Sequence, residues 1–375
     1  MNRIFAATAS AIAILAVMGS PARAELEVTV GGFAAFQAAV FDNDVANSSD
    51  RDFTSEAQIT VNADATADNG LQYGAKVTLD ASTNDTANAE EVAIYLAGGW
   101  GRVELGDDDG ASQLVVIAPT VGIGQINGSY DDFTPVGAHM RNDRGDHAFT
   151  AIDSDNSTKA TYYTPKFSGF QAGVSYAPEY QGDTILGLTI PGGNGENVTF
   201  TENTTGASNI FEIGLGYEGE FSGVMFRAGG NYIFADSVPG LEDVRAWSLG
   251  AQVGYQGFRF GGGYKNDGDS SQLTGFSDDE VAAWNVGATY ENGPFGVGVS
   301  YLNIDFDTNG ADAVGVAQGA LGLPVTSFGG EYDAFVLGAT YAIAPGLNVA
   351  ADLAFYDRDN QDDGYVLMTD VTAAF

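Results

Sequence analysis

The chain ends in the stretch Tyr365-Val366-Leu367-Met368-Thr369-Asp370-Val371-Thr372-Ala373-Ala374-Phe375, which indicates the fold class. Every second position from Tyr365 carries an apolar side chain or a threonine, and the positions between them include Asp370 and Thr372. Successive side chains of a β-strand point to opposite faces, so this order predicts one lipid-compatible face and one polar face. The same alternation recurs in residues 58–65, 71–80 and 347–356.

Sixteen runs of this kind follow one another, and they are approximately 25–41, 52–67, 71–80, 90–98, 100–107, 158–165, 170–177, 208–218, 223–234, 244–255, 258–265, 281–291, 295–305, 332–342, 347–357 and 364–375. Short Gly-, Asn- or Pro-containing turns, such as 68–70 and 256–257, alternate with long Asp-rich loops, such as 178–207 and 306–331. This alternation predicts an all-β protein, a 16-stranded antiparallel transmembrane β-barrel with both termini on the short-turn side. The alternative, a soluble β-sandwich or β-solenoid, would need polar outer faces where this chain places Leu, Val, Phe and Tyr.

The composition excludes several functional classes. Among 375 residues there are 14 Lys and Arg against 50 Asp and Glu, a net charge of -36, which disfavours a nucleic-acid partner. The chain has no Cys, so disulfides, thiolate nucleophiles and a lipidated cysteine are excluded. His139 and His147 are the only imidazoles, which leaves little material for a metal cluster or a catalytic triad. We therefore expect no enzymatic step and no required cofactor.

The N-terminus resembles a secretory signal. Arg3 precedes an apolar stretch, and Ala22 and Ala24 provide the small residues of a cleavage site, so residues 1–24 are predicted to be a cleaved signal peptide. The alternative is an N-terminal anchor, but the apolar stretch is shorter than the ~20 residues that span a bilayer. The mature chain is then a single outer-membrane domain, residues 25–375.

One connection differs from the others in length and composition. Residues 108–157 separate the fifth and sixth runs, and they include an apolar patch between Leu114 and Ile126 and the acidic pair Asp131-Asp132. A connection of this length usually has a function, and its apolar content indicates that it packs against something. Folding inward would narrow the water-filled lumen that a barrel of this size encloses, whereas an external flap is the alternative.

The chain resembles Gram-negative general-diffusion porins, in particular the alphaproteobacterial porins. The similarity rests on the signal-like start, on residues 28–33 (VTVGGF), on residues 159–176 (KATYYTPKFSGFQAGVSY) and on the terminal Phe375. The resemblance implies a homotrimer whose third external loop folds into the pore, which matches residues 108–157 in chain order. It also implies that Phe375 is read by the barrel-assembly machinery.

Strand parity assigns several charges to the lumen. Five cations share a face with polar or Gly neighbours, namely Lys76, Arg102, Arg227, Arg259 and Lys265. A cation on the lipid face would cost about 2–4 kcal/mol at mid-membrane, so we expect all five to point inward. They would form a basic wall opposite an acidic side made of Glu104, Asp107, Asp108, Asp109, Asp131 and Asp132, unless they are ordinary solvated charges away from the constriction.

The acidic loops have two further consequences. They should attract cations to the channel mouths, which predicts mild cation selectivity. Asp305, Asp307 and Asn309 copy the start of an EF-hand loop, but Val316 stands where the bidentate Glu should be. A looser Ca²⁺ site or simply solvated loops are the two remaining interpretations.

The sequence thus predicts an outer-membrane channel for passive diffusion of ions and small hydrophilic solutes, surrounded by outer-membrane lipid and lipopolysaccharide. A second interpretation is a solute-specific porin whose lumen binds one sugar or anion. A third is a structural or adhesive barrel with acidic Ca²⁺-binding loops.

Overall fold

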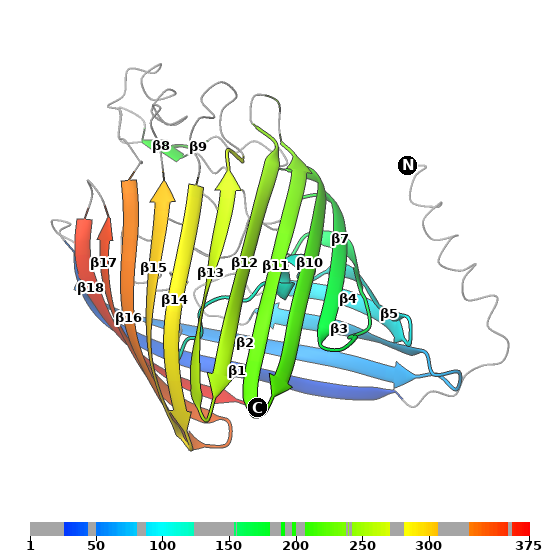
Figure 1. Cartoon of the computed structure of the whole chain (residues 1–375), viewed down its shortest axis with the longest axis horizontal. Helices are drawn as coiled ribbons and strands as arrows, with labels where there is room; N and C mark the ends of the chain where they lie inside the picture. The colour runs from blue at the N-terminus through cyan, green and yellow to red at the C-terminus, as the bar shows by residue number, and fades with distance from the viewer. Residues whose placement is uncertain are drawn as a thin grey trace.

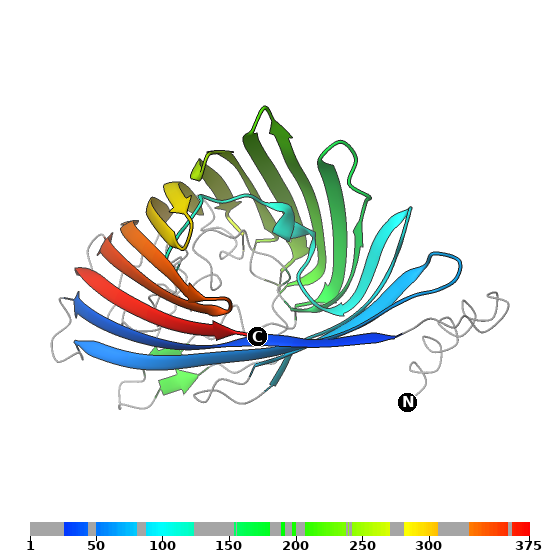
Figure 2. The same cartoon turned by 90° about the horizontal axis from the view of Figure 1, so that it is seen from below.

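The computed structural model describes residues 26–43, 50–80, 88–123, 154, 156–180, 189–191, 197–199, 207–237, 239, 242–270, 281–306, 330–358 and 362–375. Within these residues, sixteen antiparallel strands form a closed barrel in the order β1-β18-β17-β16-β15-β14-β13-β12-β11-β10-β7-β6-β5-β4-β3-β2. Figures 1 and 2 show the ring from the side and from below. The predicted all-β, 16-stranded antiparallel barrel is confirmed.

The strands of the barrel lie close to the predicted runs. They are β1 (Glu27–Asn43), β2 (Arg51–Thr66), β3 (Gln72–Asp80), β4 (Asn88–Gly98), β5 (Gly101–Asp107), β6 (Thr158–Tyr163), β7 (Phe170–Glu179), β10 (Ser208–Phe221), β11 (Val224–Asp236), β12 (Val244–Tyr255), β13 (Phe258–Gly268), β14 (Val281–Asn292), β15 (Phe295–Phe306), β16 (Gly330–Ala344), β17 (Leu347–Arg358) and β18 (Asp362–Ala374). The sequence did not predict a separate small hairpin, β8 (Thr189–Pro191) with β9 (Asn197–Thr199).

Tight turns define one end of the barrel. In the pair Ser222-Gly223 the φ angles are 53° and 80°, and in Gln256-Gly257 they are 50° and 86°. Two successive positive φ values match the two-residue turn whose twist suits an antiparallel hairpin. The C-terminus lies at this same end (Figure 1). Backbone bonds between Phe375 and Gly32, 3.0 and 3.1 Å long, join the last residue to β1.

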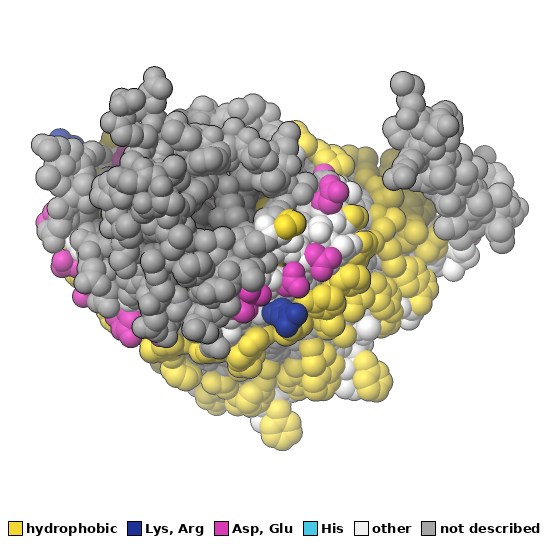
Figure 3. All heavy atoms as spheres, turned by 90° about the horizontal axis from the view of Figure 1, so that it is seen from above, with side chains coloured by type: hydrophobic (Ala, Val, Ile, Leu, Met, Phe, Trp, Pro, Cys, Tyr) yellow, Lys and Arg dark blue, Asp and Glu magenta, His cyan; other side chains and the backbone are white. Residues whose placement is uncertain are grey.

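The outer face of the wall is apolar. Phe226, Leu249, Phe260 and Val297 are exposed, and each alternates with an inward-facing neighbour on its strand. Figure 3 shows hydrophobic side chains covering the visible wall, with acidic side chains along the rim above them. A surface of this kind suits the hydrocarbon layer of a membrane. In the described part of the chain, no helix is both long and apolar enough to cross a bilayer.

The inward face is polar at mid-height but apolar towards the long-loop end. One buried cluster includes Phe41, Leu302, Tyr332 and Met368, with Ile117 packed against it, and a second lies on β7, β10, β11 and β12. These positions have inward parity, so both faces of the strands are apolar here. The predicted polar inner face is therefore found along only part of each strand, because side-chain packing replaces solvent at the long-loop end.

Candidate functional site

Residues 110–123 follow β5 and lie along the inward face of the barrel. The segment contains the short helix η1 (Ala111–Leu114) and then runs in extended form. Figure 2 shows it inside the ring of strands. Because its residues form no strand ladder with the wall, side chains must satisfy its backbone groups.

Polar side chains on five strands of the wall supply hydrogen bonds to these groups. Three backbone N–H groups of the segment donate to the wall: Ala111 N to Ser175 Oγ, Ala118 N to Asn285 Oδ1 and Ile123 N to Asp352 Oδ1. Two of its carbonyl oxygens accept from the wall: Ser112 O from Asn231 Nδ2 and Ile117 O from Gln252 Nε2. All five distances are 2.7–3.1 Å. These side chains come from β7, β11, β12, β14 and β17, so the wall holds the segment along much of its inner circumference. The sequence analysis did not single out these residues, because no local signal ties them to the segment.

Glycines give the segment room to approach the wall. A Cβ atom built on Gly214, Gly229, Gly250 or Gly338 would lie 2.0, 1.9, 1.7 and 1.9 Å from a carbonyl oxygen of the segment. Real Cβ atoms do not approach backbone so closely, so larger residues would push the segment into the lumen. The four glycines lie on β10, β11, β12 and β16, and together they form an inner track for the segment.

Lys76 lies in a cluster of charges where the segment begins. Its Nζ is 2.7 Å from Glu91 Oε2 and 3.1 Å from Asp108 Oδ1. Asp109 is next to both acids, and Lys159 donates to the carbonyl oxygen of Asp108. Burial, and then the charges of Glu91 and Asp108, raise the pKa of Asp109 to about 6, while Lys159 and Lys76 act in the opposite direction.

The same three carboxylates are the described group that could hold a metal ion. One oxygen from each of Glu91, Asp108 and Asp109 lies within 4.8 Å of the others. The Lys76 ammonium already contacts two of the three, so it supplies positive charge where a cation would sit. The arrangement therefore fits an ion-paired cluster without a metal.

Arg102 and Glu104 form a second charged group near the short-turn end. Arg102 Nε donates to Glu104 Oε1, and the guanidinium lies 3.8 Å from the centre of the Tyr95 ring. The Tyr95 hydroxyl in turn donates to Asp64 Oδ1 at 2.5 Å. Asp107 differs from Glu104, because it pairs in register with Val92 and shares the outward side of β5 with Leu105.

The remaining predicted cations are spread along the barrel axis. Arg259 Nη2 is 2.8 Å from Glu291 Oε1 near the short turns, and Lys265 Nζ is 3.0 Å from Asp267 Oδ2 in a buried pair towards the long loops. Among the described residues, Arg227 makes no ion pair. Local carboxylates thus contact the other four cations, rather than a single acidic surface on the far side.

Several predicted site residues lie outside the described residues. They are Asp131, Asp132, Asp307 and Asn309. Asp305 is exposed near the long-loop end of β15, and Phe375 is 68% exposed beside β1. The described chain therefore holds only one of the three residues of the predicted Ca²⁺ motif.

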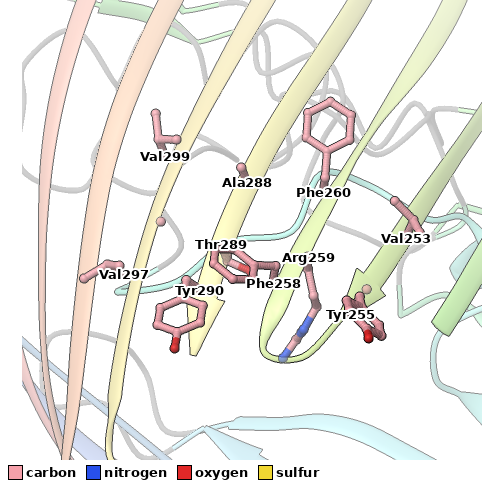
Figure 4. A pocket seen from close by; sticks show the side chains of 12 residues that line it. Val253, Tyr255, Phe258, Arg259, Phe260, Ala288, Thr289, Tyr290, Val297 and Val299 are labelled. Carbon is pink, nitrogen blue, oxygen red and sulfur yellow. The ribbon is translucent and has the colours of Figure 1, made fainter. Parts of the chain in front are cut away.

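A shallow apolar groove lies on the outer wall between β12 and β15. Phe258, Phe260, Ala288, Tyr290 and Val299 are among the residues that line it (Figure 4). Most of its lining side chains, such as Phe258, Phe260 and Val297, are exposed and have outward parity, so the groove belongs mainly to the lipid-facing surface, although Arg259 and Thr289 also line it.

Comparison with known proteins agrees with this architecture. The model of a family described as Gram-negative porin matches residues 7–361. The chain belongs to the Gram-negative porin family. It is an outer-membrane channel of a non-enzymatic family, and the prediction of a porin is confirmed.

Sequence relatives of this porin are distant. An uncharacterized protein of Rickettsia conorii is 27% identical, with 66% of this chain and 70% of the relative covered. A porin of Rhodobacter capsulatus is 24% identical over 46% of this chain and 51% of its own. Both of these relatives are alphaproteobacterial proteins.

Solved structures share the fold at low identity. A refined porin structure has a TM-score of 0.57 at 19% identity and covers 93% of this chain and all (100%) of its own. A variant of Rh. blastica porin gives 0.58 at 15%, with the same coverage. The trimer form of OmpT, an outer membrane protein of Vibrio cholerae, gives 0.58 at 13% and covers 93% and 99%.

Proposed function

We propose that this porin is a general-diffusion channel for small hydrophilic solutes and ions, with a mild preference for cations. The observation that carries the proposal is the polar mid-height of the inner wall, which holds the backbone of residues 110–123 instead of a dense apolar core. An interior of that kind admits water and hydrophilic solutes.

In this proposal residues 108–157 form the constriction loop. The described part of the loop supports this role, because it lies against the inward face and is fixed there by side chains of several strands. The charges that permeating ions meet are then the cations Lys76, Arg102, Arg227, Arg259 and Lys265 and the acids Glu104, Asp108, Asp109, Asp131 and Asp132. Four of these cations pair with nearby carboxylates rather than with one opposed acidic surface. The outward register of Asp107 removes it from this set.

Charge supports the cation preference. The net charge of -36 makes the mouths negative, and four of the basic side chains are already paired with carboxylates. Anions therefore find few free cations along the described wall. A homotrimer, a signal peptide at residues 1–24 and recognition of Phe375 by the assembly machinery complete the proposal; a trimer form among the similar folds supports the first of these.

Liposome swelling with sugars of increasing size tests the proposal. Wild-type protein should pass small sugars at rates that fall smoothly with size, and replacement of residues 124–153 by a short linker should raise the size limit. One sugar that saturates transport and blocks the others would instead identify a solute-specific porin. An unchanged size limit in the shortened variant would contradict the constriction role of the loop.

A further inference from the structure

Glu212 is a buried carboxylate on β10 that contacts two segments far apart in the chain. It is 1% exposed. Its Oε2 accepts a hydrogen bond from Ser112 N at 3.2 Å. Its Oε1 accepts from Ser154 N at 2.7 Å and from the Ser154 hydroxyl. Ser112 and Ser154 stand near the beginning and the end of residues 108–157, so one side chain joins both ends of the loop.

Gly110 makes room for this carboxylate. A Cβ atom on Gly110 would lie 1.8 Å from Glu212 Oε2 and 2.6 Å from Cδ. The φ of Gly110 is -96°, which any residue adopts, so space rather than backbone conformation requires glycine here. The Tyr163 hydroxyl donates to the Gly110 carbonyl oxygen at 2.9 Å and fixes the backbone beside the carboxylate.

The contacts of Glu212 suit a charged acceptor. Three donors converge on its two oxygens, and among the described residues no Lys or Arg forms an ion pair with it. A buried carboxylate is costly unless donors satisfy it, and hydrogen bonds to an ionised acceptor are about twice as strong as neutral ones. Loss of this acceptor would weaken both ends of the loop together, because it removes the hydrogen bonds to Ser112 N and Ser154 N, while Ser175 and Asn231 still hold the first end.

We propose that Glu212 is a positioning residue that clamps the two ends of the 108–157 loop to one point on the inner wall. The effect of this clamp on permeation rests on the proposed function, in which the loop narrows the channel. The clamp itself stands on the contacts of Glu212, Gly110, Ser112 and Ser154.

Hydrogen exchange of the Ser112 and Ser154 amides in the folded full-length protein tests the clamp. Glu212→Gln removes the charge and one acceptor, whereas Gly110→Ala keeps the charge and displaces the carboxylate. In both variants the two amides should exchange about tenfold faster or more. Glu218→Gln is the matched control, because it removes a carboxylate from the same face of β10 near the short turns and should leave the two rates unchanged.

Wild-type exchange at both amides in folded Glu212→Gln would overturn the inference. If that variant does not fold, Ser154→Ala removes only the hydroxyl donor. It should speed exchange at residue 154 and leave residue 112 unchanged, and no change at residue 154 would also overturn the inference.

Single-channel current separates the clamp from the proposed function. Glu212→Gln and Gly110→Ala should both increase open-channel noise, whereas Glu218→Gln should not. Faster exchange without any change in current or solute-size limit would support the clamp and contradict the constriction role of the loop. Suppose instead that Glu212→Gln and Glu218→Gln change the current equally, and that Gly110→Ala has the amide exchange rates and current of wild type. The effect would then come from the lost charge alone, and the inference would be overturned.

Discussion

Lys76 is a cation on the inner wall of the barrel that pairs with two carboxylates. Its ammonium group lies between Glu91 and Asp108, whose side chains are 15% and 18% exposed. Charges that are largely withdrawn from water are tolerated when they are paired, and the removal of one partner leaves the others uncompensated. Removing the lysine should therefore destabilise this cluster more than removing one partner destabilises an exposed ion pair.

Lys76→Met should lower the free energy of unfolding by about 1–3 kcal/mol, because two neighbouring carboxylates lose their shared cation. It should also increase the cation preference of the channel. Lys166→Met is the control, since its pair with Glu218 is 61% and 58% exposed and should contribute less than about 1 kcal/mol. Equal losses in the two variants, measured by chemical denaturation, would show that the cluster adds no stability.

Asp109 should make stability depend on pH. Its pKa rises from 3.8 to about 6 on folding, so the folded state binds the proton more tightly and ionisation is the costly form. This contribution is favourable below about pH 4 and is lost as the pH rises through about 6, by about 3 kcal/mol in all. Asp109→Asn mimics the protonated side chain, so it should raise the melting temperature at pH 8 and have no effect at pH 4.

The matched control for this effect is Asp68→Asn, because Asp68 is an exposed acid in the β2–β3 turn. Its melting temperature should follow wild type at both pH values. A gain for Asp109→Asn that is as large at pH 4 as at pH 8 would contradict the pH account.

At the scale of elements, period-two alternation predicted the strands well because it reflects lipid on one side and polar groups on the other. Residues 244–255 and 281–291, for example, match β12 and β14 to within one residue. Alternation fails where both faces are apolar, as at Tyr332 and Leu302, because packing inside the barrel is decided by distant segments. The β8–β9 hairpin was missed because its strands are too short to show a period.

The candidate site was less predictable than the strands. The sequence predicts that Lys76 and Lys265 point inward, but it identifies only some of the residues with which they pair. Lys265 and Asp267 are two apart on one strand and therefore share a face, a signal that the spacing contains. Glu212 and Ser154 are separated by 58 positions, and only the closed barrel brings them together.

The glycine track on the inner wall gives a prediction for an element. Gly250→Ala would place a Cβ 1.7 Å from the Val116 carbonyl oxygen and 2.8 Å from that of Gly262, so the 110–123 segment must move. We expect a loss of about 1–3 kcal/mol in stability and altered conductance. A Cβ on Gly99 would meet no atom within 4 Å, so Gly99→Ala should change stability by less than about 0.5 kcal/mol. An equal loss of stability in both variants would show that the inner-wall glycines are not needed to make room for the segment.

A substitution at the C-terminal residue of the chain can distinguish an effect on stability from an effect on assembly in the cell. Phe375 joins Gly32 through backbone atoms, which Phe375→Ala retains, and the residue is 68% exposed. The purified variant should therefore melt within a few degrees of wild type after refolding in detergent. Its yield in the outer membrane of cells should fall several-fold if the terminal aromatic is read during assembly. A wild-type yield would contradict that role.

At the scale of the whole molecule, charge should govern which ions enter. A net charge of -36 on a barrel whose inner cations are mostly paired creates a negative potential at the mouths. Salt screens such a potential, since the Debye length falls from about 10 Å at 0.1 M to about 3 Å at 1 M. The cation preference should therefore be strongest in dilute salt and should fade as the salt concentration rises.

The most direct test of the account is single-channel current of the refolded protein in a planar bilayer under a KCl gradient. We predict stepwise conductance that rises with salt without saturating, and a reversal potential that favours K⁺ at low salt and approaches zero at high salt. Silence from protein shown to be folded and inserted, or a conductance that saturates, would contradict an open, water-filled diffusion channel.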